Sequence, residues 1–257
     1  MRGASLSGAV AAVRARVGAW RRRRYLRSLA PARYAPYPAR FYRDFLSRAL
    51  RDRELEVAPF VEAPAGPGRA TLFVRHDIDT AACARGMGVL LGIDRELGVR
   101  SGIYLLAEST EYRLADHRDE IAAWRAAGFE VGLHTVCYTH DDYFAALETE
   151  TRAFADALGF APRSFTVHGL GEHRLDVRLR FYREVLPRLG QFGYEFTDCC
   201  PELRSYDRVF HDCHWDTAKQ ARYIYDELTG RRFPFERGKS YLLLTHPCYW
   251  LPQGRSA

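Results

Sequence analysis

The sequence predicts an α/β fold, a barrel or distorted barrel of about seven strands, preceded by an N-terminal helical extension. Two observations lead to this prediction. Past Gly68, short apolar runs of strand length alternate with segments of helical periodicity, which is typical of βα units and a mostly parallel sheet. In addition, nearly every apolar run is followed by a polar, titratable residue. A chain of 257 residues, 47% of them hydrophobic, can bury the core that such a fold needs.

The apolar runs define the expected strands. Seven runs with intervening helices fit a barrel or a distorted barrel better than a long open sheet, although periodicity alone does not decide between them. The clearest helix candidate is 142–158, which has one apolar face, and further helices are expected over 119–127 and 217–228. The expected strands are 71–74, 102–106, 130–133, 164–167, 194–197, 208–210 and 241–245.

Titratable side chains follow the expected strands one after another. α/β barrels build their active sites at the carboxyl ends of their strands. One such residue alone would be ordinary, as a helix cap or a buried histidine, but the repetition over six or seven strands predicts a shared site. The residues are Arg75, His76 and Asp77, then Glu108, His134, His168, Asp198, His211 with Asp212, and His246.

The highest density of reactive side chains lies in the segment TLFVRHDIDT at 71–80. Alternate side chains of a strand point the same way, so Asp77 and Asp79 share a direction if the extended backbone continues through Ile78. Two such carboxylates repel each other unless a cation lies between them. A divalent metal would let one carboxylate act as a ligand and the other as a base. An Asp-rich turn that caps the next helix is the alternative.

Three segments together resemble the polysaccharide deacetylases, the NodB-homology group of carbohydrate esterases, and in particular its divergent members with an Asp-x-Asp first motif. They are RHDID at 75–79, EVGLHT at 130–135 and LLLTHPCYW at 242–250. The resemblance covers roughly residues 70–252, in the family's order. It implies a distorted (β/α) barrel and a metal-dependent hydrolase that removes acetyl groups from N-acetylated sugars. Two alternatives stay open: hydrolysis of another linear or cyclic amide on the same scaffold, and a catalytically silent relative that binds glycans.

Carried over residue by residue, the resemblance gives a role to five side chains. Asp77 matches the family's catalytic base, and Asp79 matches its metal-binding aspartate. His134 matches the first metal-binding histidine, and His246 matches the histidine of the last motif that serves as general acid. Asp212 lies roughly where the family has an acidic residue that tunes this histidine.

The chain departs from the family at the second metal-binding histidine. The family places that residue four positions after the first, where this chain has Tyr138. His140 would reach the same metal if the loop at 135–139 bulges, and His168, at the end of another strand, is the alternative. The sequence slightly favours His140. One carboxylate and two imidazoles are a ligand set suited to Zn²⁺, so the expected cofactor is one divalent ion, zinc by preference.

Several side chains near the expected site are candidates to contact the substrate, an N-acetylated sugar or glycan. Aromatic rings stack on sugar rings, although aromatic residues at such positions are as often part of the core. The candidates are Arg75, Tyr138, Trp215 and Trp250.

Residues 1–66 are expected to form a basic and aromatic helical extension, and residues 67–257 the barrel domain. The Pro- and Gly-rich stretch 64–67 marks the boundary. Within the extension, 10–24 combines an apolar helical stripe with four consecutive arginines. Such a segment either packs on protein or lies on an anionic membrane surface.

The composition of the chain limits which binding partners and which cellular location we predict. The net charge of +6 comes almost entirely from arginine, because only Lys219 and Lys239 are lysines. No nucleic-acid motif accompanies this charge, so no nucleic-acid partner is predicted. Six cysteines without a regular framework predict reduced thiols. With no recognisable secretion signal and no stretch able to span a bilayer, the expected location is cytoplasmic, with peripheral membrane contact as an option.

Overall fold

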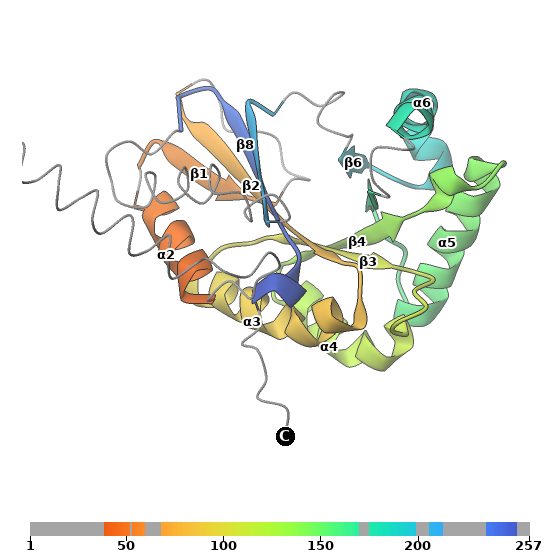
Figure 1. Cartoon of the computed structure of the whole chain (residues 1–257), viewed down its shortest axis with the longest axis horizontal. Coiled ribbons are helices and arrows are strands. Elements are labelled where there is room, and N and C mark those ends of the chain that lie inside the picture. Colours follow the sequence, from red (N-terminus) through yellow and green to blue (C-terminus); the bar gives the residue numbers. More distant parts are fainter. Residues whose placement is uncertain are drawn as a thin grey trace, which may run out of the picture.

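The structure, a computed structural model, describes residues 39–51, 53–59, 68–169, 175–198, 206–212 and 235–250. The stripe at 10–24, the helix expected at 217–228 and Trp215 lie outside the described residues. Within the described ranges the chain forms a curled parallel sheet with helices packed along it (Figure 1).

The sheet confirms the predicted fold class. Its strands run in the order β6-β5-β4-β3-β2-β8-β7, with β1 also paired to β2, and every pairing is parallel. In the described ranges the end strands β6 and β7 are not paired with each other, so the sheet curls without closing, as a distorted barrel does (Figure 1). The strands are β1 Leu55–Ala58, β2 Ala70–Ile78, β3 Gly102–Leu106, β4 Glu130–Thr135, β5 Ser164–Val167, β6 Phe196–Asp198, β7 Arg208–His211 and β8 Ser240–Thr245.

Strand β2 is the centre of the sheet. Strand β8 pairs with one of its edges over 71–76, while β1 pairs with 70–73 and β3 with 75–78. Strand β1, which the sequence analysis did not predict, therefore lies before β3 along the other edge. Residues on both sides of the stretch 64–67 thus belong to one sheet.

The helices begin and end at residues suited to those positions. Thr80 caps α3 by accepting a hydrogen bond from the Cys83 amide, and Asp142 caps α5 by accepting one from Ala145. Gly98, with φ of 69°, ends α3 in the left-handed conformation that glycine adopts without strain. None of the helices in the described ranges is long and apolar enough to cross a lipid bilayer. The helices are α2 Ala39–Ala49, α3 Ala81–Leu97, α4 Arg118–Ala126, α5 Tyr143–Leu158 and α6 Leu175–Val185.

The two faces of β2 have different surroundings. Leu72 and Val74 belong to a core cluster with residues of α2 and α3, whereas Phe73 packs in a separate cluster with residues of β3 and β8 on the inner side of the sheet. Because side chains alternate along a strand, Asp77 shares the inner side with Phe73. His76 points the opposite way, towards the helices.

A buried polar cluster surrounds His76 on the helix side. The ring nitrogens contact Thr245 Oγ1 at 2.6 Å and Asp94 Oδ2 at 2.8 Å. The Asp94 carboxylate also accepts hydrogen bonds from Ser101 Oγ at 2.6 Å and from the Tyr42 hydroxyl at 2.7 Å. Tyr42 lies on α2, so this cluster connects α2 to the central strand.

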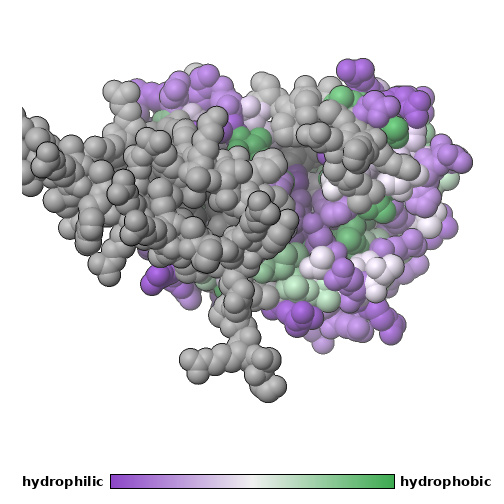
Figure 2. Space-filling model, in the orientation of Figure 1, coloured by the Kyte–Doolittle hydropathy of each residue, from purple (hydrophilic) through white to green (hydrophobic). Residues whose placement is uncertain are grey.

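The described surface shown in Figure 2 is largely hydrophilic, with hydrophobic positions scattered over it. Leu50 is the exposed large hydrophobic residue among those described. Scattered apolar residues are ordinary on a protein surface and do not mark a docking face.

Candidate catalytic and metal centre

Six titratable side chains meet where the carboxyl ends of β2, β4, β5, β7 and β8 come together. These strands lie close to one another in the sheet order, with β3 between β2 and β4. Parallel strands end at the same edge of the sheet, so Asp79 and His246, 167 positions apart in the chain, come within contact distance. The six are Asp77, Asp79, His134, His168, Asp212 and His246.

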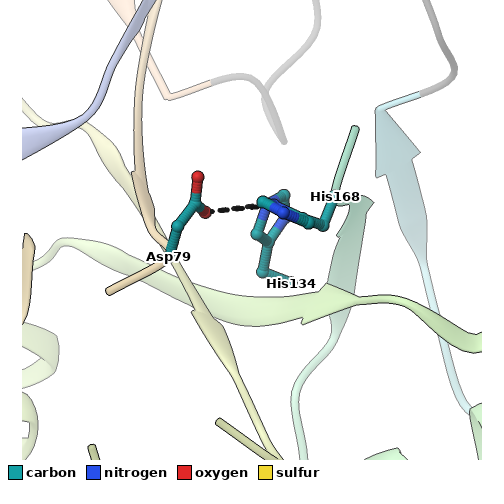
Figure 3. A group of neighbouring side chains, drawn as sticks. All are labelled: Asp79, His134 and His168. Atoms are coloured by element: carbon teal, nitrogen blue, oxygen red, sulfur yellow. Dashed lines mark hydrogen bonds and ion pairs between the residues drawn. The ribbon is translucent and has the colours of Figure 1, made fainter. Parts of the chain in front are cut away.

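Asp79, His134 and His168 form one compact group (Figure 3). Asp79 Oδ1 lies 3.2 Å from His134 Nε2 and 3.3 Å from His168 Nδ1. The two imidazole nitrogens are 3.1 Å apart. Each residue comes from the end of a different strand, and each offers one atom to a common point.

This group fits a metal ion. Two ligand atoms bound to one tetrahedral zinc ion at about 2.0–2.1 Å lie about 3.3 Å apart, close to the three separations seen here. Asp79 Oδ1 is buried, and it does not form a hydrogen bond of ordinary geometry with His134 Nε2 or His168 Nδ1. A buried carboxylate oxygen without a partner is costly, and a cation shared with the two imidazoles would remove that cost.

The charges in this group shift the pKa values of its members. Burial alone would raise the pKa of Asp79, but its contacts with His134 and His168 lower that pKa far below the usual range. Burial lowers the pKa of His168, whereas its contact with the Asp79 carboxylate raises it, and the net shift is upward. Asp79 is therefore ionised, as a metal ligand must be.

A contact on the side of the ring away from Asp79 fixes the orientation of His134. Its Nδ1 contacts Thr166 Oγ1 at 2.6 Å, while Nε2 faces Asp79. A hydrogen bond at one ring nitrogen leaves the other available as a ligand, which is a common arrangement around metals. The sequence analysis missed Thr166, although the register of β4 and β5 pairs it directly with His134.

The structure favours His168 over His140 as the third member of the group. The loop after β4 forms a short 3₁₀ turn, Cys137–Thr139, and His140 follows it outside the group. His168 therefore replaces His140 in our assignment. Tyr138, which we expected to contact substrate, is instead buried, with 1% of its surface exposed, and donates a hydrogen bond from its hydroxyl to the His168 carbonyl at 3.0 Å.

Asp77 lies beside the group but in a different environment. Arg75 Nη2 donates to Asp77 Oδ2 at 2.7 Å, and His134 Nε2 is 3.8 Å from the same oxygen. Burial would raise the pKa of Asp77, but Arg75 and the nearby histidines lower it overall. Its other oxygen, Oδ1, is buried without a hydrogen-bond partner. Arg75, a predicted substrate contact, is thus engaged with Asp77 at this site.

On the other side of Asp79, His246 and Asp212 form a hydrogen-bonded pair. His246 Nδ1 is 2.7 Å from Asp212 Oδ1, and the His246 backbone N–H donates to Asp212 Oδ2 at 2.5 Å. The second ring nitrogen, Nε2, lies 3.3 Å from Asp79 Oδ2. The Asp79 carboxylate thus faces the two-histidine group with one oxygen and His246 with the other.

His211 joins Asp212 and His246 in a second group of metal-binding residue types. The 2.7 Å contact between His246 and Asp212 is a hydrogen-bond distance, shorter than the separation of about 3.3 Å between two ligands of one tetrahedral zinc ion. His211 Nδ1 lies 4.0 Å from Asp212 Oδ1. The geometry therefore describes a histidine–carboxylate pair better than a second metal site.

The remaining predicted substrate contacts are corrected or untested. Trp250 is fully buried, and its indole donates to Asp212 Oδ2 at 3.0 Å, so its ring does not face a substrate. Trp250 was expected to contact the substrate because aromatic rings stack on sugars, but the 3₁₀ turn Pro247–Trp250 carries it into the core. Trp215 lies outside the described residues. Tyr249 is partly exposed, and its ring centroid lies 5.7 Å from that of His246.

Comparison with known proteins gives weak structural likenesses. No family model matches the sequence, and no curated protein matches it. The structure is similar to a mutant of a CE4 family pseudoenzyme with restored enzymatic activity, at 12% identity over 73% of this chain and a TM-score of 0.42. It is also similar to the wild-type pseudoenzyme from Bacillus anthracis, at 11% identity over 73% of this chain and a TM-score of 0.39.

A third similar structure is a peptidoglycan deacetylase from Bdellovibrio bacteriovorus, at 16% identity over 75% of this chain and a TM-score of 0.31. The chain spans 63%, 61% and 56% of the lengths of these three proteins.

Proposed function

We propose that this chain is a metal-dependent hydrolase of the polysaccharide deacetylase type, which removes an acetyl group from an N-acetylated sugar or glycan by hydrolysing the amide bond. The observation that supports this best is the position of the Asp79 carboxylate. One of its oxygens faces His134 and His168, and the other faces His246. A candidate metal group and a candidate acid thus lie on opposite sides of one carboxylate.

Asp79, His134 and His168 are the residues that would hold the ion. When bound, a zinc ion supplies a Lewis acid that polarises the substrate carbonyl and lowers the pKa of a water molecule. The hydrogen bond between His134 and Thr166 keeps His134 Nε2 turned towards Asp79.

Asp77 is the proposed general base. Its ion pair with Arg75 keeps it ionised, and its buried Oδ1 accepts no hydrogen bond from a protein donor that would compete with a water molecule. The lowered pKa also makes Asp77 a weak base. Asp77 would therefore accept a proton only weakly from bulk water, and more readily from a water molecule whose pKa a bound metal had lowered.

His246 is the proposed general acid. Asp212 contacts Nδ1 and so leaves Nε2, on the side of Asp79, as the nitrogen that donates a proton to the leaving amine. An amine is a poor leaving group unless it is protonated as the C–N bond breaks. The fixed Nδ1 contact also sets the direction in which the ring points.

The substrate would reach these groups from solvent. The side chains of Asp79, His168 and His246 keep 16%, 23% and 10% of their surface exposed. Tyr249, next to His246, offers a partly exposed ring against which a sugar would pack.

The first test is metal content and acetate release of the purified full-length protein. We expect one equivalent of zinc and release of acetate from an N-acetylglucosamine oligomer. Asp79→Ala, His134→Ala and His168→Ala should each lose the metal, whereas the matched control His140→Ala should keep it. Asp77→Asn should keep the metal and lower turnover by about 10² or more, the scale of a lost general base.

Two results would contradict the proposal. One is a full equivalent of zinc retained at the same site by both Asp79→Ala and His134→Ala. The other is loss of metal from Asp77→Asn, which would mean that the two aspartates have exchanged roles.

A further inference from the structure

The Asp212 carboxylate is held by donors from His246, which directly follows β8, and from Trp250 in the turn after it. Oδ1 contacts the ring of His246, and Oδ2 accepts hydrogen bonds from the His246 backbone N–H and from the Trp250 indole at 3.0 Å. Asp212 is 1% exposed. Since Asp212 in turn fixes the His246 ring, the indole acts on that ring through one intervening carboxylate.

Trp250 itself packs against helix α2. Its ring packs edge-on against Tyr42 of α2, with 5.6 Å between the ring centroids. Tyr42 is 1% exposed, and its hydroxyl donates to Asp94 of α3 at 2.7 Å. A continuous set of buried contacts therefore runs from α2 through Tyr42, Trp250 and Asp212 to His246.

We infer that Trp250 is a positioning residue for the general acid, and that α2 serves as its support through Tyr42. This inference rests on the proposed function, because it assumes that His246 donates the proton. Without the indole donor, Asp212 Oδ2 loses one of its fixed partners and the carboxylate gains rotational freedom. The His246 ring then points at the leaving group for a smaller fraction of the time.

If Trp250 positions the general acid, removing its N–H should slow amide hydrolysis more than ester hydrolysis. Substituting the outer partners that orient metal-ligating side chains typically costs about 10- to 100-fold in metal affinity or activity, and we expect a cost on this scale for a partner that orients the acid. Trp250→Phe, which keeps an aromatic ring against Tyr42 but removes the N–H, should lower kcat for an amide by about that factor with little change in KM. Hydrolysis of an activated acetate ester, whose leaving group hardly needs a proton, should change less than threefold.

The experiment uses the full-length, zinc-loaded chain with an N-acetylglucosamine oligomer and 4-nitrophenyl acetate. Trp124→Phe is a matched control, because Trp124 also donates to a carboxylate, that of Glu120 at 3.5 Å, but on α4. We expect this control to leave the amide-to-ester ratio unchanged. If Trp250→Phe folds poorly, the isosteric benzothienylalanine at position 250 removes the donor while keeping the shape.

A second readout does not require turnover. In the metal-free protein, the NMR signal of the His246 Nδ1 proton should exchange faster with solvent after the Trp250 donor is removed, and should be unchanged in Trp124→Phe. An unaltered signal together with a wild-type amide-to-ester ratio would overturn the inference, as would an equal loss on both substrates.

The two proposals fail in different ways. If the wild-type protein hydrolyses neither substrate, or if His246→Ala loses both equally, the proposed function fails, and the NMR signal alone decides whether Trp250 positions His246. If His246→Ala shows the selective loss and the donor-free variant does not, only the inference about Trp250 fails.

Discussion

The molecule contains two histidine–carboxylate pairs of almost the same length in different surroundings. His76 and Asp94 are 2.8 Å apart on the helix side, and His246 and Asp212 are 2.7 Å apart at the end of β8. The first pair is completely buried, and both nitrogens of its ring have fixed partners. The second leaves Nε2 directed at Asp79.

On the proposed function, this difference separates a structural pair from a reactive one. A ring with both nitrogens occupied by its own protein can orient and stabilise neighbouring elements, but it has no nitrogen left for a substrate. His76 even precedes Asp77 directly, and the alternation along β2 sends the two side chains to opposite faces. The surroundings of the ring decide the role, more than the residue type or its place in a motif.

The largest expected effect falls on the reactive pair. His246→Ala should keep the fold and the metal and lower amide hydrolysis by about 10³-fold, within the range of general acid catalysis. An activated acetate ester should lose far less, because its leaving group departs without a proton. Steady-state kinetics on both substrates measure the ratio. A structure of the protein in which His246 points away from the metal group would remove the acid role.

The matching change at the buried pair should affect stability instead. His76→Ala deletes two hydrogen bonds and leaves the buried Asp94 with fewer donors, which should lower the free energy of unfolding by about 3 kcal/mol. Metal content of the folded fraction should stay the same. Urea unfolding measures the shift, and His117→Ala, at a partly exposed histidine, should change stability by less than about 0.5 kcal/mol. Equal shifts for the two variants would refute the structural role of His76.

A third buried carboxylate sharpens the comparison because the groups that chiefly shift its pKa are uncharged or acidic. Glu150 on α5 is 5% exposed, and its Oε1 has no hydrogen-bond partner. Burial is the main cause that raises its pKa to about 7. Between about pH 4.5 and pH 7 the folded protein therefore holds a proton that the unfolded chain has released. The unfolding free energy falls as pH rises through that window, by about 3 kcal/mol in total.

Glu150→Gln should abolish this pH-dependent loss of unfolding free energy. The variant should match the wild type near pH 4.5 and exceed its stability by about 2–3 kcal/mol at pH 8, as measured by urea unfolding at the two pH values. Glu148→Gln, at an exposed position of the same helix, is the control and should change neither value. A wild-type stability that is flat across the window would contradict the assignment.

The sequence was sufficient to predict the sheet and most of the centre. Period-two patterning and strand ends place Asp77, Asp79, His134, Asp212 and His246 correctly at one edge, because parallel strands bring their carboxyl ends together whatever the loops do.

The choice between His140 and His168 could not be made from sequence, because it depends on how tightly the loop after β4 turns. The substrate contacts predicted for Tyr138 and Trp250 were wrong for the same reason. Each lies in a short 3₁₀ turn whose direction is set by tertiary packing, and local patterning carries no information on that.

The order of the strands has a consequence for synthesis of the protein on the ribosome. Strand β8 is the last strand in the described part of the chain, yet it occupies the edge of β2 that extends over 71–76. That edge has no β8 partner until about 170 further residues have been translated. Contacts between segments so far apart form slowly, and an open strand edge can pair with other nascent chains meanwhile. The group of side chains around Asp79 can therefore assemble with His246 only after the segment of 167 residues that separates the two has been translated.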